Sequence, residues 1–316
     1  MCKSVGTYTI CGCLFLYYTG NLLHTHGSYN WKIGQHGIGF GADLEAKDEN
    51  GDTPLFVACG STDLRVAQLL LDYGADVEAP GGEGHFTLLH VAIWGCSLEI
   101  TELLLTGGAD MEARDVDGSA PLHHASVRNR LGHMDVLINR GANLEAKNEN
   151  GETSLHLICR SSKNHVDNGV HLLLDRGANI EAKNNSGRTP MHVVTGLSAS
   201  PMLLDEGASL EATDRRFDAT LHRACSGHNS SLARLLLNHG ADLEATANLG
   251  FRPLHFAAVN DFPNVVRLLL NRGAVVLVDA KTFAGMTLLS LACQKEKVEI
   301  VWLLVRRCPW LVDWQV

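Results

Sequence analysis

The chain has 316 residues, of which 45% are hydrophobic and 19% are charged, and its formal net charge is −9 at pH 7. This balance is typical of a globular chain with a buried core. The negative charge argues against a general nucleic-acid binder, because such a protein needs a basic face to neutralise phosphates.

Residues 1–40 do not match the pattern of the rest of the chain. Their apolar run from Ile10 to Tyr18 is shorter than the about 20 residues that a helix needs to span a bilayer, so we expect no membrane span. The segment resembles a signal peptide, but it is also compatible with a poorly ordered leader or with a degenerate N-terminal unit whose helix caps the core. The spacings of Cys11 with Cys13 and of His24 with His26 do not fit a zinc site, so we expect no metal.

From residue 41 onward the chain repeats one pattern, which reads GANLEAKNENGETSLH at residues 141–156. Successive copies are 33, 34, 33, 36, 30, 33 and 33 residues apart, and they start at Gly41, Gly74, Gly108, Gly141, Gly177, Gly207, Gly240 and Gly273. Several copies continue into a T-P-L-H-like motif, as in Thr53-Pro54-Leu55, Pro121-Leu122-His123, Thr189-Pro190-Met191-His192 and Pro253-Leu254-His255.

This period and motif together resemble the ankyrin repeat, and the resemblance covers residues 41–308. It implies an all-α solenoid of helix-turn-helix units with β-hairpin fingers. We expect about eight to nine such repeats, which fill residues 41–316 together with a C-terminal cap.

Each unit is predicted to contain two short helices with one apolar face each. In the fourth copy, Leu155 belongs to the first helix and Leu173 to the second, and such faces can be buried only against the neighbouring units. Gly177 ends the second helix, and Thr189 with Pro190 starts the next unit as N-cap and first helical residue.

Four cysteines recur at one position of the repeat, six residues after the motif threonine or its equivalent: Cys59, Cys159, Cys225 and Cys293. One repeated position indicates one structural role, which for cysteine is that of a small apolar side chain. We therefore expect reduced cysteines and a cytoplasmic or nuclear location.

Histidines and glutamates also recur in step with the repeat, which argues against catalytic roles for single members. The resemblance implies that the histidines tie neighbouring turns together by hydrogen bonds, whereas the glutamates are expected to form a solvated edge. No phosphate loop, nucleophile elbow, zinc-protease or kinase signature is present, so we predict a non-enzymatic chain without a cofactor. The repeated residues are His90, His123, His156, His192, His222 and His255, and Glu45, Glu78, Glu112, Glu145, Glu181, Glu211 and Glu244.

Three places depart from the repeat. Additional residues within 161–168 and a deletion before Pro201 predict a change of curvature between Arg160 and Pro201. Phe217 stands where other copies have glycine, so its finger is predicted to be either rearranged or functional, because a positive φ strains a bulky residue.

The C-terminal end is rich in tryptophan, with Trp302, Trp310 and Trp314. Cys308 and Pro309 replace the Gly-Ala pair there, so no further finger of the same form can follow. The tryptophans are predicted to cover the last exposed core; alternatively they mark a truncated array or a docking patch.

The resemblance implies that partner proteins bind the concave surface of finger tips and first helices. Arginines gather in the middle of this surface and apolar residues near its C-terminal fingers, and both types often anchor interfaces. We expect an acidic peptide or loop to cross the middle, although a solvated row of fingers with incidental arginines is the alternative. The candidate residues are Trp94, Arg128, Arg160, Arg188, Arg215, Arg216, Phe217, Leu249, Phe251, Phe283 and Met286.

The predicted function is that of a monomeric scaffold that binds other proteins and no nucleic acid. One alternative is a regulatory or targeting subunit of a larger signalling, ubiquitin-ligase or enzyme assembly whose catalytic part lies elsewhere. A purely structural spacer is the other.

Overall fold

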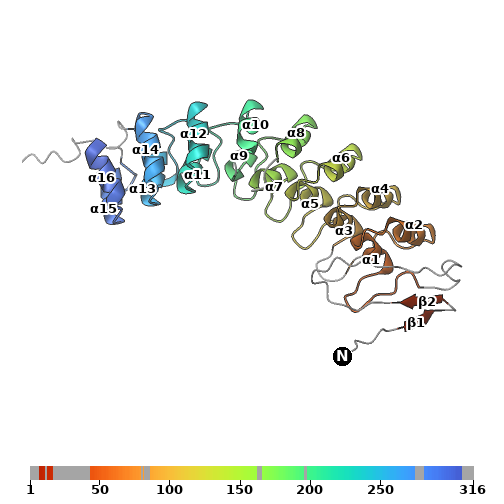
Figure 1. The fold of residues 1–316 in the computed structure, drawn as a ribbon. Coiled ribbons are helices and arrows are strands. Elements are labelled where there is room, and N and C mark those ends of the chain that lie inside the picture. Colours follow the sequence, from red (N-terminus) through yellow and green to blue (C-terminus); the bar gives the residue numbers. More distant parts are fainter. Residues whose placement is uncertain are drawn as a thin grey trace, which may run out of the picture.

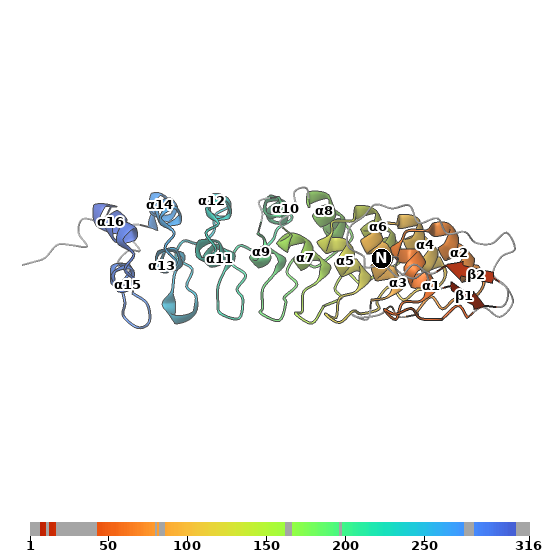
Figure 2. The same ribbon diagram turned by 60° about the horizontal axis from the view of Figure 1, so that its bottom comes forward.

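A computed structural model describes residues 7–10, 13–16, 43–79, 81, 86–161, 166–195, 198–274 and 281–307 (Figure 1). Within these ranges sixteen α-helices form eight consecutive pairs, and each pair stacks on the next. The odd-numbered first helices line the inner side of the bend and the even-numbered second helices its outer side (Figure 1). The loops between pairs project from one side as a row of fingers (Figure 2). The body of the molecule is therefore a helical solenoid.

The first helices are α1 (Pro54–Gly60), α3 (Leu88–Gly95), α5 (Pro121–Val127), α7 (Ser154–Arg160), α9 (Pro190–Val193), α11 (Thr220–Ser226), α13 (Pro253–Val259) and α15 (Leu288–Gln294). The second helices are α2 (Leu64–Asp72), α4 (Leu98–Thr106), α6 (Leu131–Asn139), α8 (Asp167–Asp175), α10 (Ala199–Asp205), α12 (Ser230–Asn238), α14 (Pro263–Asn271) and α16 (Val298–Arg307). A short 3-10 turn, η1 (Asn248–Gly250), lies in one finger.

A two-stranded antiparallel sheet precedes the solenoid, and it corrects the all-α expectation for the leader. Strand β1 (Thr7–Ile10) pairs with β2 (Cys13–Leu16), with Thr7 opposite Leu16. The described part of the apolar run therefore lies in strands and not in the capping helix that was one of the alternatives. Threonine, tyrosine and isoleucine favour strands, and only two residues, one of them glycine, separate the two strands. Cys11, His24 and His26 lie outside the described residues.

The motif histidines fasten each first helix to the following finger. In the fourth unit the backbone N–H of Thr153 donates to Nδ1 of His156 at 3.2 Å, which leaves the hydrogen on Nε2. That Nε2 then donates to the carbonyl oxygen of Arg188 at 2.9 Å. Equivalent bonds to carbonyl oxygens, at 3.0–3.1 Å, are made by His90, His123, His192 and His222. The prediction that the motif histidines tie neighbouring turns together is confirmed for these five residues.

The repeated glutamates form a second set of bonds between units, which corrects the expectation of a merely solvated edge. Oε1 of Glu145 accepts the backbone N–H of Asn179, in the following unit, at 2.7 Å. Five further glutamates accept the equivalent amide at 2.7–2.9 Å: Glu45, Glu78, Glu112, Glu181 and Glu211. Each partner lies about one repeat further along the chain, so only the stacked units bring the two groups together.

Backbone hydrogen bonds also join the fingers, which we number by the first helix that each precedes. The third to eighth fingers comprise residues 115–119, 148–152, 184–188, 214–218, 247–251 and 282–286. The amide of the second residue of a finger donates to the carbonyl of the third residue of the preceding finger, as from Arg215 to Ser186 at 3.0 Å and from Phe283 to Leu249 at 2.9 Å. Isolated antiparallel bridges flank the sixth and eighth fingers, Thr213 with Ala219 and Lys281 with Thr287, and no strand is assigned in the described fingers. The β-hairpin form of the fingers stays a prediction.

One continuous apolar core runs through all eight helix pairs of the described chain. The repeated cysteines contribute to it as predicted, since Cys59, Cys159 and Cys225 are unpaired and buried, whereas Cys293 in the last pair is exposed. Burial raises the pKa of the Cys59 thiol to about 12, so this thiol is unreactive at neutral pH. None of the helices in the described ranges is long and apolar enough to cross a bilayer.

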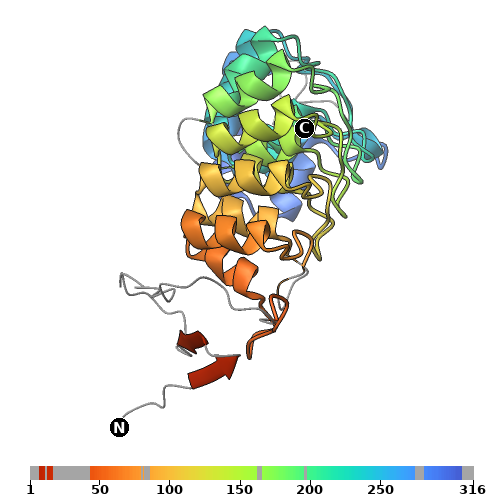
Figure 3. The same ribbon diagram turned by 90° about the vertical axis from the view of Figure 1, so that its right-hand side faces the viewer.

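The array changes direction where the repeat length varies. From α16 to α11 the pairs run level, and from α8 to α2 the row descends (Figure 1). Viewed along the array, the pairs still stack with their fingers on one side (Figure 3). Helix α9 lies at the turning point and has four residues, whereas α7 and α11 have seven. The bend falls in the segment for which the sequence predicts a change of curvature.

At the C-terminal end Trp302 is 54% exposed on α16. The guanidinium carbon of Arg306 lies 5.0 Å from the centre of its ring. Trp310 and Trp314 lie outside the described residues. That they cover the last exposed part of the core therefore stays a prediction.

Replacing Glu145 with alanine tests the bonds between units. We expect the free energy of unfolding to fall by about 1 kcal/mol, because the Asn179 amide loses a charge-assisted partner. Urea denaturation measures the change. Glu102→Ala on the exposed face of α4 is the matched control, and an equal loss in both variants would contradict the assigned role.

Acidification is expected to weaken the array through the motif histidines. Burial lowers the pKa of both His90 and His123 to about 4, from 6.5 in the unfolded chain. Their contribution to stability is complete above pH 6.5 and is lost as the pH falls toward 4, with a loss of about 2 kcal/mol for each residue at pH 5. Urea denaturation of the wild type and of His123→Gln between pH 7 and 5 checks this. The variant should lose less stability than the wild type over this range, whereas His239→Gln, at an exposed site, should match the wild type.

Candidate functional site

A hollow of about 340 Å³ lies in the middle of the array, between α7, α9 and α11. It exists where α9 stops after four residues, so that less side-chain volume separates the neighbouring first helices. We call it the central hollow. Its lining combines charged and polar side chains with a few apolar ones, and the polar members are Glu152, Arg160, Asn184, Arg188, His192, Thr195, Arg223 and Asn229.

Two of the predicted arginines meet at the central hollow, and each has a buried carboxylate as its partner. Arg160 contacts Glu152 at 3.0 Å, and the Glu152 side chain is only 4% exposed. Arg188 contacts Asp214 at 3.4 Å, and the Asp214 side chain is 1% exposed. The first pair lies within the fourth unit, and the second joins the fifth unit to the sixth. They also hold the two guanidinium groups at the wall of the hollow.

A third arginine of the hollow, Arg223 on α11, was missed by the sequence reasoning. In the described part of the chain its guanidinium makes no hydrogen bond or ion pair, and its Nε is buried without a partner. Burial lowers the pKa of Arg223 and the charge of Arg188 lowers it further, whereas the carboxylates of Asp214 and Asp218 raise it. A signal was present in the sequence, because six other copies have apolar residues at this position, although a seventh has His124: Val57, Val91, Leu157, Val193, Phe256 and Leu291.

The buried acid next to this arginine is Asp218. Burial raises its pKa, and the neighbouring Asp214 carboxylate raises it further. Among the residues that line the hollow, the acid is Glu152 and the arginines are Arg160, Arg188 and Arg223. Asp214 and Asp218 are not part of the lining, but their charges act on Arg223.

Trp94 and Arg128 lie at a separate place, the aromatic cluster of Phe86, His90, Trp94 and His124. The ring centres of Phe86 and Trp94 are 4.2 Å apart, and those of Trp94 and His124 are 5.6 Å apart. The guanidinium carbon of Arg128 lies 5.2 Å from the centre of the Trp94 ring, which is a cation–π distance. The cluster therefore presents a supported tryptophan on the inner side of the array.

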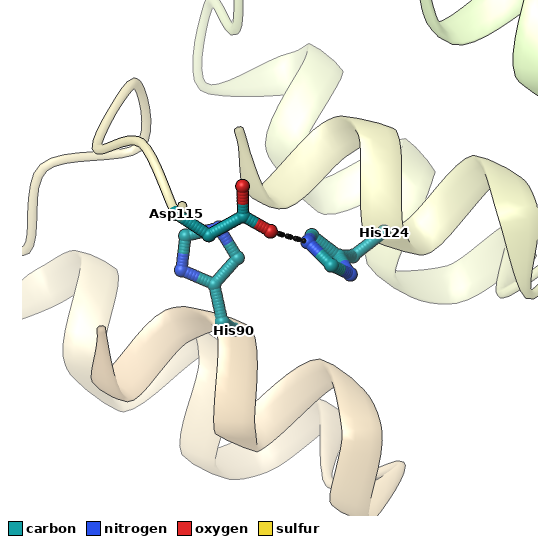
Figure 4. Close-up of side chains that lie close together, drawn as sticks. All are labelled: His90, Asp115 and His124. Carbon is teal, nitrogen blue, oxygen red and sulfur yellow. Dashed lines mark hydrogen bonds and ion pairs between the residues drawn. The ribbon is translucent and has the colours of Figure 1, made fainter. Parts of the chain in front are cut away.

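His90, Asp115 and His124 come close enough for a metal site, with candidate ligand atoms within 4.8 Å of one another (Figure 4). Their hydrogen bonds do not fit one. Nδ1 of His124 accepts the indole N–H of Trp94 at 3.2 Å, so its Nε2 carries the hydrogen that is donated to Asp115 at 2.7 Å.

His90 is committed in the same way. Its Nδ1 accepts the Thr87 amide at 3.2 Å, and its Nε2 donates to the carbonyl oxygen of Ser119 at 3.1 Å. Neither histidine has a lone pair left for a cation. The group is therefore a hydrogen-bonded support for Trp94.

Three consecutive fingers, the sixth to the eighth, expose large apolar side chains. Phe217 is 63% exposed, Leu249 60% and Phe283 80%, and we call these residues the fingertip row. The backbone bonds between fingers hold the tips in fixed register. Arg215 and Arg216 are exposed at the tip of the sixth finger, away from the hollow.

The conformation of the sixth finger decides between the two predictions made for Phe217. Its φ is +62°, as expected for a position that other copies fill with glycine. The finger keeps the turn of its neighbours, since the Phe217 amide donates to the Asp214 carbonyl at 3.0 Å. The finger is therefore not rearranged, and a strained, exposed phenylalanine is left for a functional explanation.

The last two predicted residues, Phe251 and Met286, are half-buried at the bases of the seventh and eighth fingers. The ring centre of Phe251 lies 5.8 Å from that of Phe256 on α13. Phe251 thus packs inside its finger. Its side chain is less exposed to a partner than the side chains of the fingertip row.

Comparison with known families matches the model for ankyrin repeats in three copies to residues 29–115, 122–214 and 196–280. Among solved structures, the chain is similar to the ankyrin repeat domain of Bcl-3, described as a unique member of the IkappaB protein family. The two chains are 26% identical with a TM-score of 0.55, over 80% of this chain and 100% of the other. No curated protein gives a significant match.

Replacing Phe217 with glycine tests the strain in the sixth finger. We expect the free energy of unfolding to rise by about 1 kcal/mol, because glycine adopts a positive φ without a steric penalty and the lost side chain is mostly exposed. Phe283→Gly is the control, since Phe283 is exposed without a positive φ. Urea denaturation should show the control destabilised, and destabilisation of both variants would contradict strain at Phe217.

Proposed function

The chain belongs to the ankyrin-repeat family, and we propose that it is a non-enzymatic scaffold that binds partner proteins along its inner face and fingertips. Ankyrin repeats are generally protein-protein interaction modules. Each of the eight helix pairs counts as one repeat in this proposal. The residues that differ between copies carry its specificity, because the repeated residues are occupied in folding.

The fingertip row is the observation that carries this proposal. Isolated exposed apolar residues are ordinary on a protein surface, but a group of them indicates an interaction site. Here Phe217, Leu249 and Phe283 occupy three neighbouring fingers that are joined by backbone hydrogen bonds. Phe217 also keeps a strained conformation that glycine would relieve. We take the row as the apolar anchor for the partner.

An acidic segment of the partner is proposed to continue from this anchor toward the middle of the array. Arg215 and Arg216 stand exposed beside Phe217, and Arg188 lies one finger further along. Exposed arginines of this kind raise the association rate and set the direction in which a partner binds. The supported Trp94 with Arg128 lies farther along the inner side and offers a second aromatic contact.

We further propose that the protein acts as a monomer in the reducing environment of the cytoplasm or nucleus. The buried, unpaired thiols of Cys59, Cys159 and Cys225 support such a compartment. The fold supports a partner that is a protein, and the net charge of −9 does not favour nucleic acid.

Affinity purification with mass spectrometry tests the scaffold proposal. The wild type is compared with Arg215→Glu/Arg216→Glu and with Leu249→Ser/Phe283→Ser. Proteins that bind the proposed surface should fall at least tenfold in both variants, as expected for the loss of two central side chains. Arg234→Glu, on the exposed side of α12, should leave the set of bound proteins unchanged. An identical set in all four proteins would contradict the proposal and favour a spacer.

A further inference from the structure

The outer side of the array is divided by charge. In the seventh unit Arg267, Asn271 and Arg272 are exposed on or directly after α14, and the same three positions can be compared in every unit. In units one to five they hold six carboxylates and two arginines, whereas in units seven and eight they hold four arginines and no carboxylate. The carboxylates are those of Asp72, Glu102, Asp135, Asp175, Asp205 and Glu206, and the two arginines are Arg140 and Arg176. The net charge of −9 therefore conceals a basic surface on α14 and α16.

This basic surface also contains an exposed tryptophan. Helices α14 and α16 lie side by side on the outer side (Figure 1), where Arg267 reaches Glu299 of α16 at 3.4 Å. Trp302 stands on α16 at the position that Arg267 has on α14, and it is 54% exposed with the guanidinium of Arg306 stacked on its ring. Val298, four residues earlier on the same helix, is 79% exposed. We call the following residues the outer patch: Arg267, Arg272, Trp302, Arg306 and Arg307.

Two arginines of the outer patch are held by neutral partners. Arg272 donates to Oδ1 of Asn238 at 2.8 Å, and Arg307 donates to Oδ1 of Asn271. An amide oxygen orients a guanidinium without cancelling its charge. The carboxylate of Glu299 does oppose Arg267, but both side chains of that pair are exposed, so their attraction is weak. The outer patch therefore keeps most of its positive charge for a partner.

The fold does not require these side chains. A basic residue at the C-terminus of a helix is favourable because of the partial negative charge there, yet α2, α4 and α10 are followed by Tyr73, Gly107 and Glu206. Packing does not require Trp302 either, since the other units have a polar residue or proline at its position. Those residues are Gln68, Glu102, Asp135, His171, Pro201, Arg234 and Arg267. Tryptophan and arginine are, however, the side chains that most often anchor protein interfaces.

We propose that the outer patch binds a short acidic segment of a second partner protein. Carboxylates of the segment pair with the arginines, and one of its apolar side chains packs against Trp302 and Val298. The outer patch lies on second helices, on the other side of the array from the first helices. The inference therefore goes beyond the proposed function, and the array would hold one protein on each side.

The division of charge favours a short segment over an extended polyanion. A bilayer or a nucleic acid presents phosphates over a wide area, so it would also meet the carboxylates of the neighbouring units, such as Asp205 and Glu206 on and after α10. A few acidic residues of a protein can stay on α14 and α16, where each guanidinium binds a carboxylate through two parallel hydrogen bonds. A second copy of the chain is disfavoured because its acidic second helices also lie on a convex side, and two convex surfaces touch over a small area.

Fluorescence anisotropy of the full chain with a fluorescein-labelled peptide of sequence EDELLEDE tests the proposal. We expect a dissociation constant of about 10–100 μM, as for a few charge-assisted contacts and one apolar contact. Arg306→Glu/Arg307→Glu and Trp302→Ala should each weaken binding at least fivefold, and unchanged binding in both would overturn the proposal. Glu299→Gln frees Arg267 and should strengthen binding about twofold, which a misfolded variant could not do. Arg234→Glu, one helix away from the outer patch, should change binding less than twofold.

Further probes separate charge, apolar contact and other kinds of partner. The neutral peptide QNQLLQNQ should bind at least tenfold more weakly, and EDEGGEDE, which lacks the leucines, at least threefold more weakly. Equal binding of QNQLLQNQ would overturn the proposal. Phosphatidylcholine vesicles that contain phosphatidylserine, a short oligothymidine strand and sedimentation of the chain alone test a bilayer, a nucleic acid and a second copy. Any of these associations that is lost in Arg306→Glu/Arg307→Glu would assign the outer patch to that partner instead.

Arg215→Glu/Arg216→Glu separates this inference from the scaffold proposal, and it should bind EDELLEDE as the wild type does. If binding falls in this variant but not in Arg306→Glu/Arg307→Glu, the peptide occupies the fingers, so the outer patch is wrong and the scaffold proposal stands. If binding depends on the outer patch while no bound protein depends on the fingertip variants, the outer patch stands and the proposed inner interface is wrong.

Discussion

A hydrogen bond between one unit and the next is the interaction on which the whole array depends. A single helix pair cannot bury its own apolar faces, so each unit is stable only against its neighbours. Three sets of polar contacts fix how the neighbours stack: the motif histidines, the repeated glutamates and the backbone bonds between fingers. Their partners lie about one repeat apart. This spacing explains why the period is nearly constant. It also explains why residues that make none of these bonds can differ between copies.

Function is left to the positions that these contacts do not use. The aromatic cluster and the central hollow differ in whether their polar groups are all hydrogen-bonded. In the cluster, Trp94, His124 and Asp115 complete one another's hydrogen bonds, so the group is rigid and needs no ligand. In the hollow, Arg223 and Glu152 retain buried groups without partners. Fully hydrogen-bonded polar groups of this kind make a surface rigid.

The irregular fifth unit connects the shape of the array with this chemistry. Helix α9 has one turn, and the hollow and the change of direction both occur beside it. The arginines at the hollow come from three successive units, through Arg160, Arg188 and Arg223. A deletion of three residues in one repeat can therefore open a hollow without a new motif, because the stacked neighbours supply its walls.

The sequence by itself determined the helical units and the buried cysteines, and its resemblance to the ankyrin repeat supplied the linking role of the motif histidines. These features follow from a local pattern that is repeated, so each copy supports the interpretation of the others. Only the tertiary structure decided that the glutamates bond between units, that His124 and Asp115 support Trp94, and that Arg223 faces Arg188. Those contacts join side chains of different units, and their distances depend on the length of α9 and the stacking of its neighbours. The sequence left several alternatives open for the leader for a related reason, since an apolar run alone does not distinguish a helix from paired strands.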